Sequence, residues 1–477
     1  MAKIALIQNF AYEYLGILYI EGVLSNAGHR VQLFLDLGNQ RQLIKDLASF
    51  APDLVGLTVT TTAKGWALDL AVAINQTVKT KIILGGPHPT YFPEVIHEPS
   101  ISIICRGEGE FAMLELANKI DRAEDLTDTG SCWFKVGNSV IKNEQTPLIE
   151  ELDRLSFPNR DSYYRKYPFL NVSRKSFMAT RGCPFSCSYC YNHGLKKLYE
   201  GKGKYVRRRS VDNIIEEIRQ VLVRYRLRTV YMQDDTFILE EQWVGEFMKQ
   251  YRQEIKRPLI CLIRADLTNE PLIARLAEGG CKAVFFGIET GDEILRNRLL
   301  KKEIRDEQIY TSAKLLKRYG IKFRTYNMVG LPDETLTQMW KTVMINIDIK
   351  TPYPWCAIFQ PFAGTELGDY AREYGFVEDK NVQESTSYFQ ITPLKSAYKN
   401  ELINLQKLFF YAVKFPKLFP LIKKIVKVRP NPVFNVLFLM SYGWCYYKSE
   451  NLLFKEMISI GLRNFKSLFN IRQFWRE

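Results

Sequence analysis

The stretch Arg181-Gly182-Cys183-Pro184-Phe185-Ser186-Cys187-Ser188-Tyr189-Cys190 decides the fold, because it places three cysteines within eight residues. Three thiols in one short loop serve no packing purpose and indicate a metal site. A four-iron four-sulfur cluster usually takes four protein thiolates, so a set of three would leave one iron open to an external ligand. Chemistry would take place at that open iron.

Zinc is the alternative occupant of this loop. Cys183, Cys187, Cys190 and His193 have the donor types of a tetrahedral site with three sulfurs and one nitrogen. Zinc modules are usually small and self-contained, whereas this loop opens a long series of strands and helices. The context favours an iron-sulfur cluster, although the spacing alone leaves zinc open.

An alternating pattern of apolar strands and helical segments begins directly before the cysteines and continues to about residue 375. It predicts strands over residues 177–180, 229–232, 259–263, 283–287, 322–328 and 355–360. Six strand-helix units predict an incomplete parallel barrel over residues 173–375, with its active site at the carboxyl ends of the strands.

Residues 1–124 carry a second alternating series. It predicts strands over residues 3–9, 31–36, 54–60, 81–84 and 101–105. The fold class is therefore α/β, and this part forms a doubly wound, Rossmann-like sheet that binds ligands at the carboxyl edge of its strands. The periodicity fades over residues 125–172, where Pro147, Pro158 and Pro168 predict a wrapping linker.

Residues 376–477 form a basic, aromatic and mostly helical region. From Lys395 onward there are 15 Lys and Arg residues against four Glu, so most of the net charge of +14 lies in this segment. Apolar clusters are interleaved with the charges, and nucleic acid, a membrane surface and a plain helical domain all remain open as its role. The longest apolar run is about nine residues, whereas crossing a bilayer takes roughly 20.

The composition of the whole chain is that of an ordinary globular protein. With 477 residues, of which 46% are hydrophobic, it can build two or three cores. The start of the chain lacks the pattern of a signal peptide. Nine cysteines, three of them clustered, do not resemble a disulfide framework. We predict a cytoplasmic protein, with membrane association left open.

The C-x3-C-x2-C spacing, with the aromatic Tyr189 before the last cysteine, resembles the radical S-adenosylmethionine (SAM) superfamily. The resemblance implies one four-iron four-sulfur cluster on Cys183, Cys187 and Cys190, with the methionine part of SAM on the open iron. Reductive cleavage of SAM would then yield a 5′-deoxyadenosyl radical. An external electron donor of the flavodoxin or ferredoxin type is implied as a partner.

Residues that follow the later barrel strands occur in the same order as the SAM-binding residues of this superfamily. Tyr189 is expected near the adenine, Asp234 and Asp235 near the methionine ammonium, and Arg264 and Glu289 near the carboxylate and ribose of SAM. Gly330, in Gly330-Leu331-Pro332, and Gln360 belong to tight turns that would let the backbone approach the adenine. Taken singly, each could instead be a structural salt-bridge partner, a helix cap or an ordinary turn.

The first 124 residues are similar to the cobalamin-binding domain that precedes the barrel in one large radical SAM subfamily. The most distinctive feature is Gly85-Gly86-Pro87-His88-Pro89-Thr90, where two glycines would let a bulky planar cofactor approach the backbone. His88 is expected to form a hydrogen bond rather than to bind metal. The implied cobalamin-binding residues are Gly16, Thr58, Thr60, Gly85, Gly86, Pro87, His88, Gly107 and Glu108.

One departure from the best-known cobalamin-binding domains affects the chemistry. Those domains use Asp-x-His-x-x-Gly after the first strand to ligate cobalt. When Gly16 is aligned with the glycine of that motif, Ala11 and Glu13 stand at the Asp and His positions. We therefore predict that no histidine ligates cobalt in this chain.

The resemblance implies a cobalamin-dependent radical SAM enzyme that methylates an unactivated carbon of a small, hydrophobic substrate through methylcobalamin. The alternative within the family is a cyclase or oxidase acting on a tetrapyrrole, lipid or natural product. Outside it, an RNA-modifying or non-catalytic metal-binding protein is the rival, with nucleic acid disfavoured because no RNA-binding domain is recognisable. The basic C-terminal region fits a peripheral membrane contact equally well.

Overall fold

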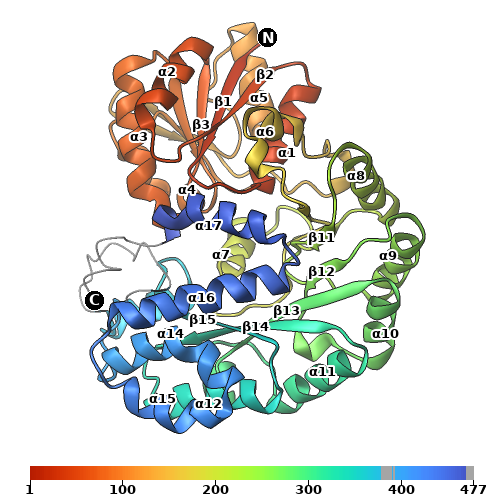
Figure 1. Cartoon of the computed structure of the whole chain (residues 1–477). Helices are drawn as coiled ribbons and strands as arrows, with labels where there is room; N and C mark the ends of the chain where they lie inside the picture. The colour runs from red at the N-terminus through yellow and green to blue at the C-terminus, as the bar shows by residue number, and fades with distance from the viewer. Residues whose placement is uncertain (378–388, 390–392, 469–477) are drawn as a thin grey trace. The chain divides into compact units, whose positions relative to one another are not determined.

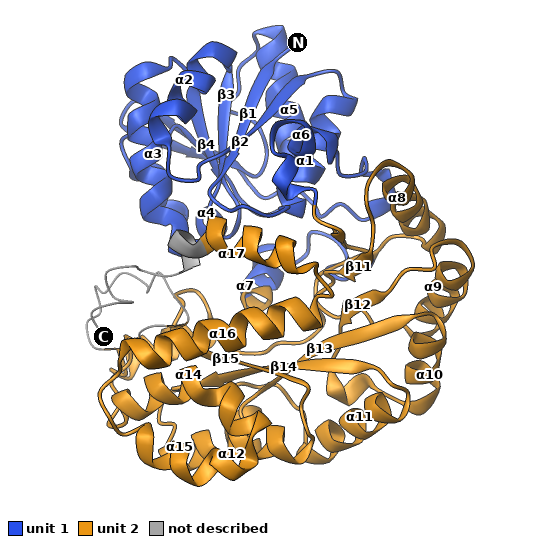
Figure 2. Ribbon diagram, in the orientation of Figure 1, with its two compact units in different colours: residues 1–171, 194–207 blue, residues 172–193, 208–477 orange. Residues whose placement is uncertain are grey.

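The chain forms two compact units, residues 1–171 with 194–207 and residues 172–193 with 208–477 (Figure 2). They are described from a computed structural model that covers residues 1–377, 389 and 393–468. Each unit is built around one large sheet with a hydrophobic core of its own.

The sheet of the first unit has the order β2-β1-β3-β4-β5-β6-β7, in which β1 to β5 are parallel. Helices pack on both of its faces, α2 beside α3 and α1 beside α5 (Figure 1). This is the doubly wound sheet predicted from the alternating pattern. Its strands are β1 (Lys3–Gln8), β2 (Arg30–Leu35), β3 (Leu54–Thr58), β4 (Lys81–Gly85) and β5 (Ile103–Cys105), and its helices are α1 (Leu15–Asn26), α2 (Gln40–Phe50), α3 (Lys64–Thr77), α4 (Pro87–Tyr91) and α5 (Glu110–Arg122).

The stretch 125–172 is not a linker, as the sequence predicted, but part of the first unit. It contains β6 (Cys132–Val136) and β7 (Ser139–Lys142), which form an antiparallel hairpin on the edge of β5, and the helix α6 (Asp161–Lys166). The prediction was wrong because both strands are short and half-exposed, so they lack the apolar runs of the buried strands.

The second unit contains a six-stranded parallel sheet in the order β15-β14-β13-β12-β11-β8. Helices cover its outer face, as predicted for a partial barrel (Figure 1). The strands are β8 (Arg174–Phe177), β11 (Thr229–Met232), β12 (Leu259–Leu262), β13 (Cys281–Glu289), β14 (Lys322–Val329) and β15 (Tyr353–Ile358), and the helices are α8 (Val211–Arg224), α9 (Glu241–Glu254), α10 (Glu270–Glu278), α11 (Asp306–Arg318), α12 (Leu336–Asp348) and α13 (Glu366–Glu373). A two-residue strand, β9 (Thr180–Arg181), precedes the cysteines. The unit boundaries after residues 193 and 207 fall within helix α7 (Tyr191–Leu198) and the short strand β10 (Arg207–Arg208).

The C-terminal region is not a separate domain, because its helices pack against the barrel. Side chains of α14 share a hydrophobic core with β14, β15 and α12. Part of residues 376–477 lies outside the described residues, so that part of the helical prediction is not tested. The helices are α14 (Lys399–Lys414), α15 (Phe419–Ile425), α16 (Pro432–Ser449) and α17 (Phe454–Leu468).

A buried charge cluster joins the end of α16 to the interior of the barrel. Glu450 accepts hydrogen bonds from Arg174 on β8 and from Arg324 on β14, the latter at 3.0 Å. The side chains of Glu450 and Arg324 are 4% and 3% exposed. The Arg324 guanidinium also lies 4.2 Å from the ring centroid of Phe285. One carboxylate therefore compensates two buried cations, contributed by the edge strand β8 and by the inner strand β14.

Removing this carboxylate should destabilise the second unit strongly. In Glu450→Ala both arginines stay buried without their counter-charge, and we expect a loss of about 3–5 kcal/mol in the free energy of unfolding. Urea denaturation measures this loss. Glu366→Ala, which breaks an exposed pair with Lys301, should cost less than about 1 kcal/mol. Equal effects of the two variants would contradict the buried cluster.

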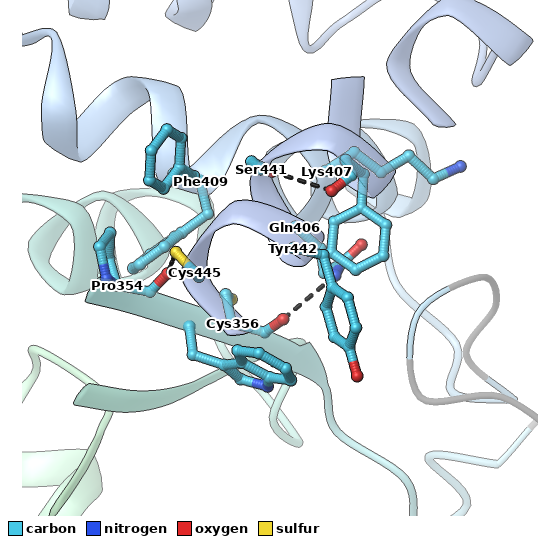
Figure 3. A pocket seen from close by; sticks show the side chains of 11 residues that line it. Pro354, Cys356, Gln406, Lys407, Phe409, Ser441, Tyr442 and Cys445 are labelled. Atoms are coloured by element: carbon cyan, nitrogen blue, oxygen red, sulfur yellow. Dashed lines mark hydrogen bonds between the residues drawn. The ribbon is translucent and has the colours of Figure 1, made fainter. Parts of the chain in front are cut away.

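A small cavity of ≈ 20 Å³ lies between β15, α14 and α16 (Figure 3). Trp355, Cys356, Gln406 and Tyr442 are among its lining residues, and the Gln406 side chain donates to the Cys356 carbonyl at 3.1 Å. A single water needs about 10–15 Å³, so this space has room for a water but not for a cofactor or a substrate.

Candidate cofactor site

The cysteine loop follows the first barrel strand, at the carboxyl edge where the prediction placed it. Cys187 is buried, while Cys183 and Cys190 are half-buried, and all three are free thiols. Burial raises the pKa of Cys183, and it raises the pKa of Cys190 to about 11. Among the described residues, no three His, Cys, Asp or Glu side chains are already grouped closely enough to hold a metal ion.

Asp234 and Asp235, which follow β11, have different surroundings. One oxygen of the fully buried Asp234 accepts hydrogen bonds from the amides of Ala179 at 3.1 Å and Thr180 at 2.5 Å. Asp234 therefore fixes the chain that leads into the cysteine loop. Asp235 lies near the thiols, since its charge raises the pKa of Cys190. Of the two, Asp235 has the better position for a cationic group bound at the thiols.

Tyr189, Glu289 and Lys302 form a compact cluster beside the cysteines. One oxygen of Glu289 accepts from the Tyr189 hydroxyl at 3.0 Å and from Lys302 Nζ at 2.6 Å, and Nζ lies 3.1 Å from the Tyr189 oxygen. Glu289 has φ +67°, a strained conformation for a residue other than glycine. The structure thus brings two predicted site residues together and adds Lys302, which the sequence analysis missed.

Two further predicted residues lie after β14 and β15. Gly330 has φ +80°, and its amide donates to the buried Glu334 at 2.7 Å. The Leu331 amide donates to the same oxygen at 3.1 Å, so Glu334 holds the turn. Gln360 is buried directly beyond β15, where its carbonyl accepts from the Phe362 amide at 2.9 Å.

Glu334 should make stability depend on pH. Burial raises its pKa to about 7, so the folded chain keeps a proton that the unfolded chain releases near pH 4.5. Glu334 therefore contributes about 3 kcal/mol to the free energy of unfolding. This contribution is fully present below pH 4.5 and is lost as the pH rises through 7. Urea unfolding between pH 4.5 and 8 should give Glu334→Gln a flatter dependence than the native chain. An unchanged dependence would contradict this assignment, and Glu366→Gln is the exposed control.

In the first unit, the predicted cobalamin-binding residues meet at the carboxyl edge of β3, β4 and β5. Gly86 has φ +95°, and a Cβ there would lie 3.2 Å from Thr58 Oγ1 and from the Val59 backbone. The Thr90 hydroxyl donates to the Gly86 carbonyl at 2.8 Å and accepts from the Gly107 amide at 3.0 Å. The three loops therefore form one hydrogen-bonded network. Thr90 is a member that the sequence analysis quoted without assigning it a role.

Other residues of the predicted cobalamin set are placed as follows. Gly85 ends β4, Pro87 begins α4, Gly16 lies in the first turn of α1, and Thr60 Oγ1 lies 3.2 Å from Thr62 Oγ1. The His88 ring is buried and stacks on Phe92, and burial followed by the charge of Lys64 lowers its pKa to about 4. Neither ring nitrogen has a hydrogen-bond partner among the residues that the structure describes, so the prediction that His88 forms a hydrogen bond was wrong.

The carboxylates of Glu108 and Glu13 are both engaged within the first unit. Both oxygens of Glu108 accept hydrogen bonds from Arg207 at 2.9 Å. The Glu108 side chain is therefore engaged in an internal ion pair and not directed to cobalamin by any contact in the structure. Glu13, at the position of the missing cobalt-binding histidine, lies 3.9 Å from the buried Arg160.

Comparison with known proteins assigns each unit to a family. Residues 178–344 match the model of the Radical SAM superfamily, and residues 9–117 match that of the B12 binding domain. The chain belongs to the cobalamin-binding radical SAM family. The two matches make SAM and cobalamin the cofactors of this radical SAM enzyme, and a [4Fe-4S] cluster is bound with cobalamin in the similar solved structure of TsrM from Kitasatospora setae. The family match favours an iron-sulfur cluster over zinc in the cysteine loop.

Relatives of this radical SAM enzyme include proteins of two kinds. It is similar to an uncharacterized methyltransferase of Pyrococcus horikoshii, with 28% identity over 368 residues that cover 76% of this chain and 79% of the relative. It is also similar to the anaerobic magnesium-protoporphyrin IX monomethyl ester cyclase of Rubrivivax gelatinosus, with 27% identity over 75% of this chain and 67% of the relative.

A solved structure confirms the fold. The cobalamin-dependent S-adenosylmethionine radical enzyme OxsB, with aqua-cobalamin and S-adenosylmethionine bound, aligns with a TM-score of 0.68 and 16% identity. The alignment covers 98% of this chain and 76% of that one, so it includes the C-terminal helices of the radical SAM enzyme. None of the helices in the described part of the chain is long and apolar enough to cross a membrane.

Proposed function

We propose that this enzyme transfers a methyl group to an unactivated carbon of a small molecule. The observation that carries the proposal is the joining, in one chain, of an open three-cysteine loop and a cobalamin-binding unit. A methyltransferase relative that shares most of its length supports it further. When bound, the cluster and SAM supply a 5′-deoxyadenosyl radical, and cobalamin supplies the methyl group.

Different residues of the chain would bind and orient different parts of SAM. Cys183, Cys187 and Cys190 would hold the cluster, and the solvent-accessible Asp235 carboxylate, near the thiols, would accept the methionine ammonium. The Glu289 carboxylate, held by Lys302 and Tyr189, would orient the ribose. The turn at Gly330 would bring backbone close to the adenine.

The cobalamin unit would bind its cofactor without a histidine on cobalt. Glu13 stands at the position of that ligand in this alignment and lies beside Arg160, and Gly86 keeps the edge of β4 open. Bound without a histidine from this chain, cobalamin would supply its methyl group to a carbon radical. An EPR spectrum of the bound Co(II) form should lack the splitting from a histidine nitrogen, and a spectrum that contains it would refute this part.

The test is anaerobic reconstitution with iron, sulfide and hydroxocobalamin, followed by a reductant and SAM that carries a deuterated methyl group. A methyltransferase should form both 5′-deoxyadenosine and S-adenosylhomocysteine, with the deuterated methyl group on cobalamin by mass spectrometry. Formation of 5′-deoxyadenosine without methylated cobalamin would overturn methyl transfer and favour the second candidate. That candidate is a cyclase or oxidase, which the similarity to the magnesium-protoporphyrin cyclase supports.

We further propose that the C-terminal helices contact an anionic membrane surface from the inside of the cell. Residues 402–449 contain no Asp or Glu. The apolar residues Val433, Val436, Met440 and Trp444 are exposed along one side of α16. Exposed apolar side chains beside lysines are typical of helices that lie on anionic bilayers.

Sedimentation with phosphatidylserine vesicles tests this contact. Reversing the charge of Lys423, Lys424 and Lys427 should lower vesicle binding at least about tenfold, because each basic residue contributes about 1 kcal/mol near an anionic surface. Raising the salt concentration should weaken binding by the native chain. Equal binding to uncharged phosphatidylcholine vesicles, or a gel shift of tRNA in place of vesicle binding, would contradict the proposal.

A further inference from the structure

Arg264, which follows β12, packs directly on the cysteine loop. Its guanidinium lies 3.5 Å from the centroid of the Phe185 ring, and its Nη1 lies 3.8 Å from Cys187 Sγ. Cys187 is the most buried of the three loop cysteines. An Arg side chain thus covers the loop at the thiol that is farthest from solvent.

The other nitrogens of this guanidinium already have partners. Nε donates to one oxygen of Asp266 at 3.1 Å, and Nη2 donates to the other at 3.0 Å. Nη2 also donates to the Lys302 carbonyl at 2.7 Å. The side chains of Arg264 and Asp266 are 8% and 14% exposed. Asp266 and the Lys302 carbonyl therefore fix the orientation of the Arg264 guanidinium. Nη1 is the nitrogen that faces the sulfur.

We propose that Arg264 is a positioning residue that hydrogen-bonds the Cys187 thiolate and raises the reduction potential of the bound cluster. This role differs from the contact with the SAM carboxylate that sequence position predicted, because the side chain that would reach SAM is occupied by Asp266 and Lys302. The inference rests on the iron-sulfur cluster of the proposed function, but not on methyl transfer.

The physical reason is electrostatic. Reduction adds a negative charge to the cluster, and a donor hydrogen bond and a positive charge next to a ligating sulfur stabilise the more negative state. The effect is larger in a buried site, where water screens charges poorly. Asp266 offsets part of the positive charge, but its oxygens bind Nε and Nη2 on the sides away from Nη1.

The experiment compares reconstituted native enzyme with Arg264→Gln and Arg264→Lys in a reductive titration followed by EPR. Arg264→Gln should move the midpoint to a more negative potential, so that about tenfold less cluster is reduced relative to oxidised at the native midpoint. Arg264→Lys keeps the positive charge but lacks the planar guanidinium group. Its midpoint potential should lie between those of the native enzyme and Arg264→Gln. If Arg264→Gln does not retain iron, the lysine variant carries the comparison.

Arg275→Gln is the matched control, because Arg275 forms an exposed pair with Glu241 on the outer helices and should leave the potential unchanged. Midpoints of both Arg264 variants equal to the native value would overturn the proposal. An unchanged midpoint with weaker binding of SAM would assign Arg264 to the SAM carboxylate instead. A native chain without any iron-sulfur cluster would refute the proposed function itself, which separates the two failures.

Discussion

Cys183→Ala should abolish SAM cleavage by this enzyme. Two thiolates cannot hold the four-iron cluster in place of three, so the reconstituted variant should lose its labile sulfide and its broad absorbance. Formation of 5′-deoxyadenosine from SAM and dithionite should fall at least about a thousandfold, because the cluster is the group that would pass the electron to the sulfonium. Iron and sulfide analysis with product chromatography measures both effects.

The control for this variant is Cys281→Ala. Cys281 is buried at the start of β13, where its thiol donates to the Ala283 carbonyl and lies on the opposite end of the strand from Glu289. This variant should keep the full cluster and the full rate of cleavage. If Cys183→Ala also retained an intact cluster and cleaved SAM, the assignment of the three ligands would be wrong.

Gly86→Val should eliminate cobalamin binding while leaving the iron-sulfur cluster intact. Gly86 has φ +95°, and its missing Cβ would lie 3.2 Å from three atoms of Thr58 and Val59. A β-branched residue is strained in that conformation and would push the loop away from the β3 edge. Retention of hydroxocobalamin on a desalting column, read from its absorbance, should drop at least about tenfold.

Gly65→Ala is the matched control for this variant. A Cβ at Gly65 would meet nothing within 4 Å, and the residue lies in helix α3, where alanine is favoured over glycine. It should bind cobalamin as the native chain does. Normal cobalamin retention by Gly86→Val would contradict the assignment of the β4 edge to the cofactor.

The strands and the cysteine loop could be predicted from the sequence because their signals are local. Apolar runs separated by helical segments mark buried parallel strands, and the parallel strands β1 to β5, β8 and β11 to β15 begin or end within a few residues of the predictions. The hairpin of β6 and β7 could not be predicted in the same way. It lies on the sheet edge with exposed positions, such as Val136 and Lys142, in place of a continuous apolar run.

The packing of the C-terminal region could not be predicted from local sequence patterns. Its basic composition left nucleic acid, a membrane surface and a plain helical domain open as its role. In the structure Lys407 is 1% exposed, and Glu450 pairs with Arg174, a residue far away along the chain. Pairs separated by hundreds of residues leave no trace in spacing or periodicity. The packing of this region on the barrel therefore appears only in three dimensions.

Some residues of the candidate site could be predicted from the sequence, and others could not. Residues directly after strands, such as Asp235 and Glu289, could be predicted because parallel strands end at one edge. Lys302, Asp266 and Glu334 could not, since they lie within loops or turns and act by holding another side chain or a backbone turn. Which of two adjacent aspartates faces the thiols also depended on side-chain direction.

Whether SAM binds directly to the iron that the three cysteines leave open is tested most directly by electron-nuclear double resonance. The sample is the reduced native enzyme with SAM carrying nitrogen-15 in its amino group. The account predicts a nitrogen-15 coupling to the cluster, in protein that contains about four iron and four sulfide per chain. Zinc without labile sulfide, or a cluster signal that SAM does not alter, would contradict it.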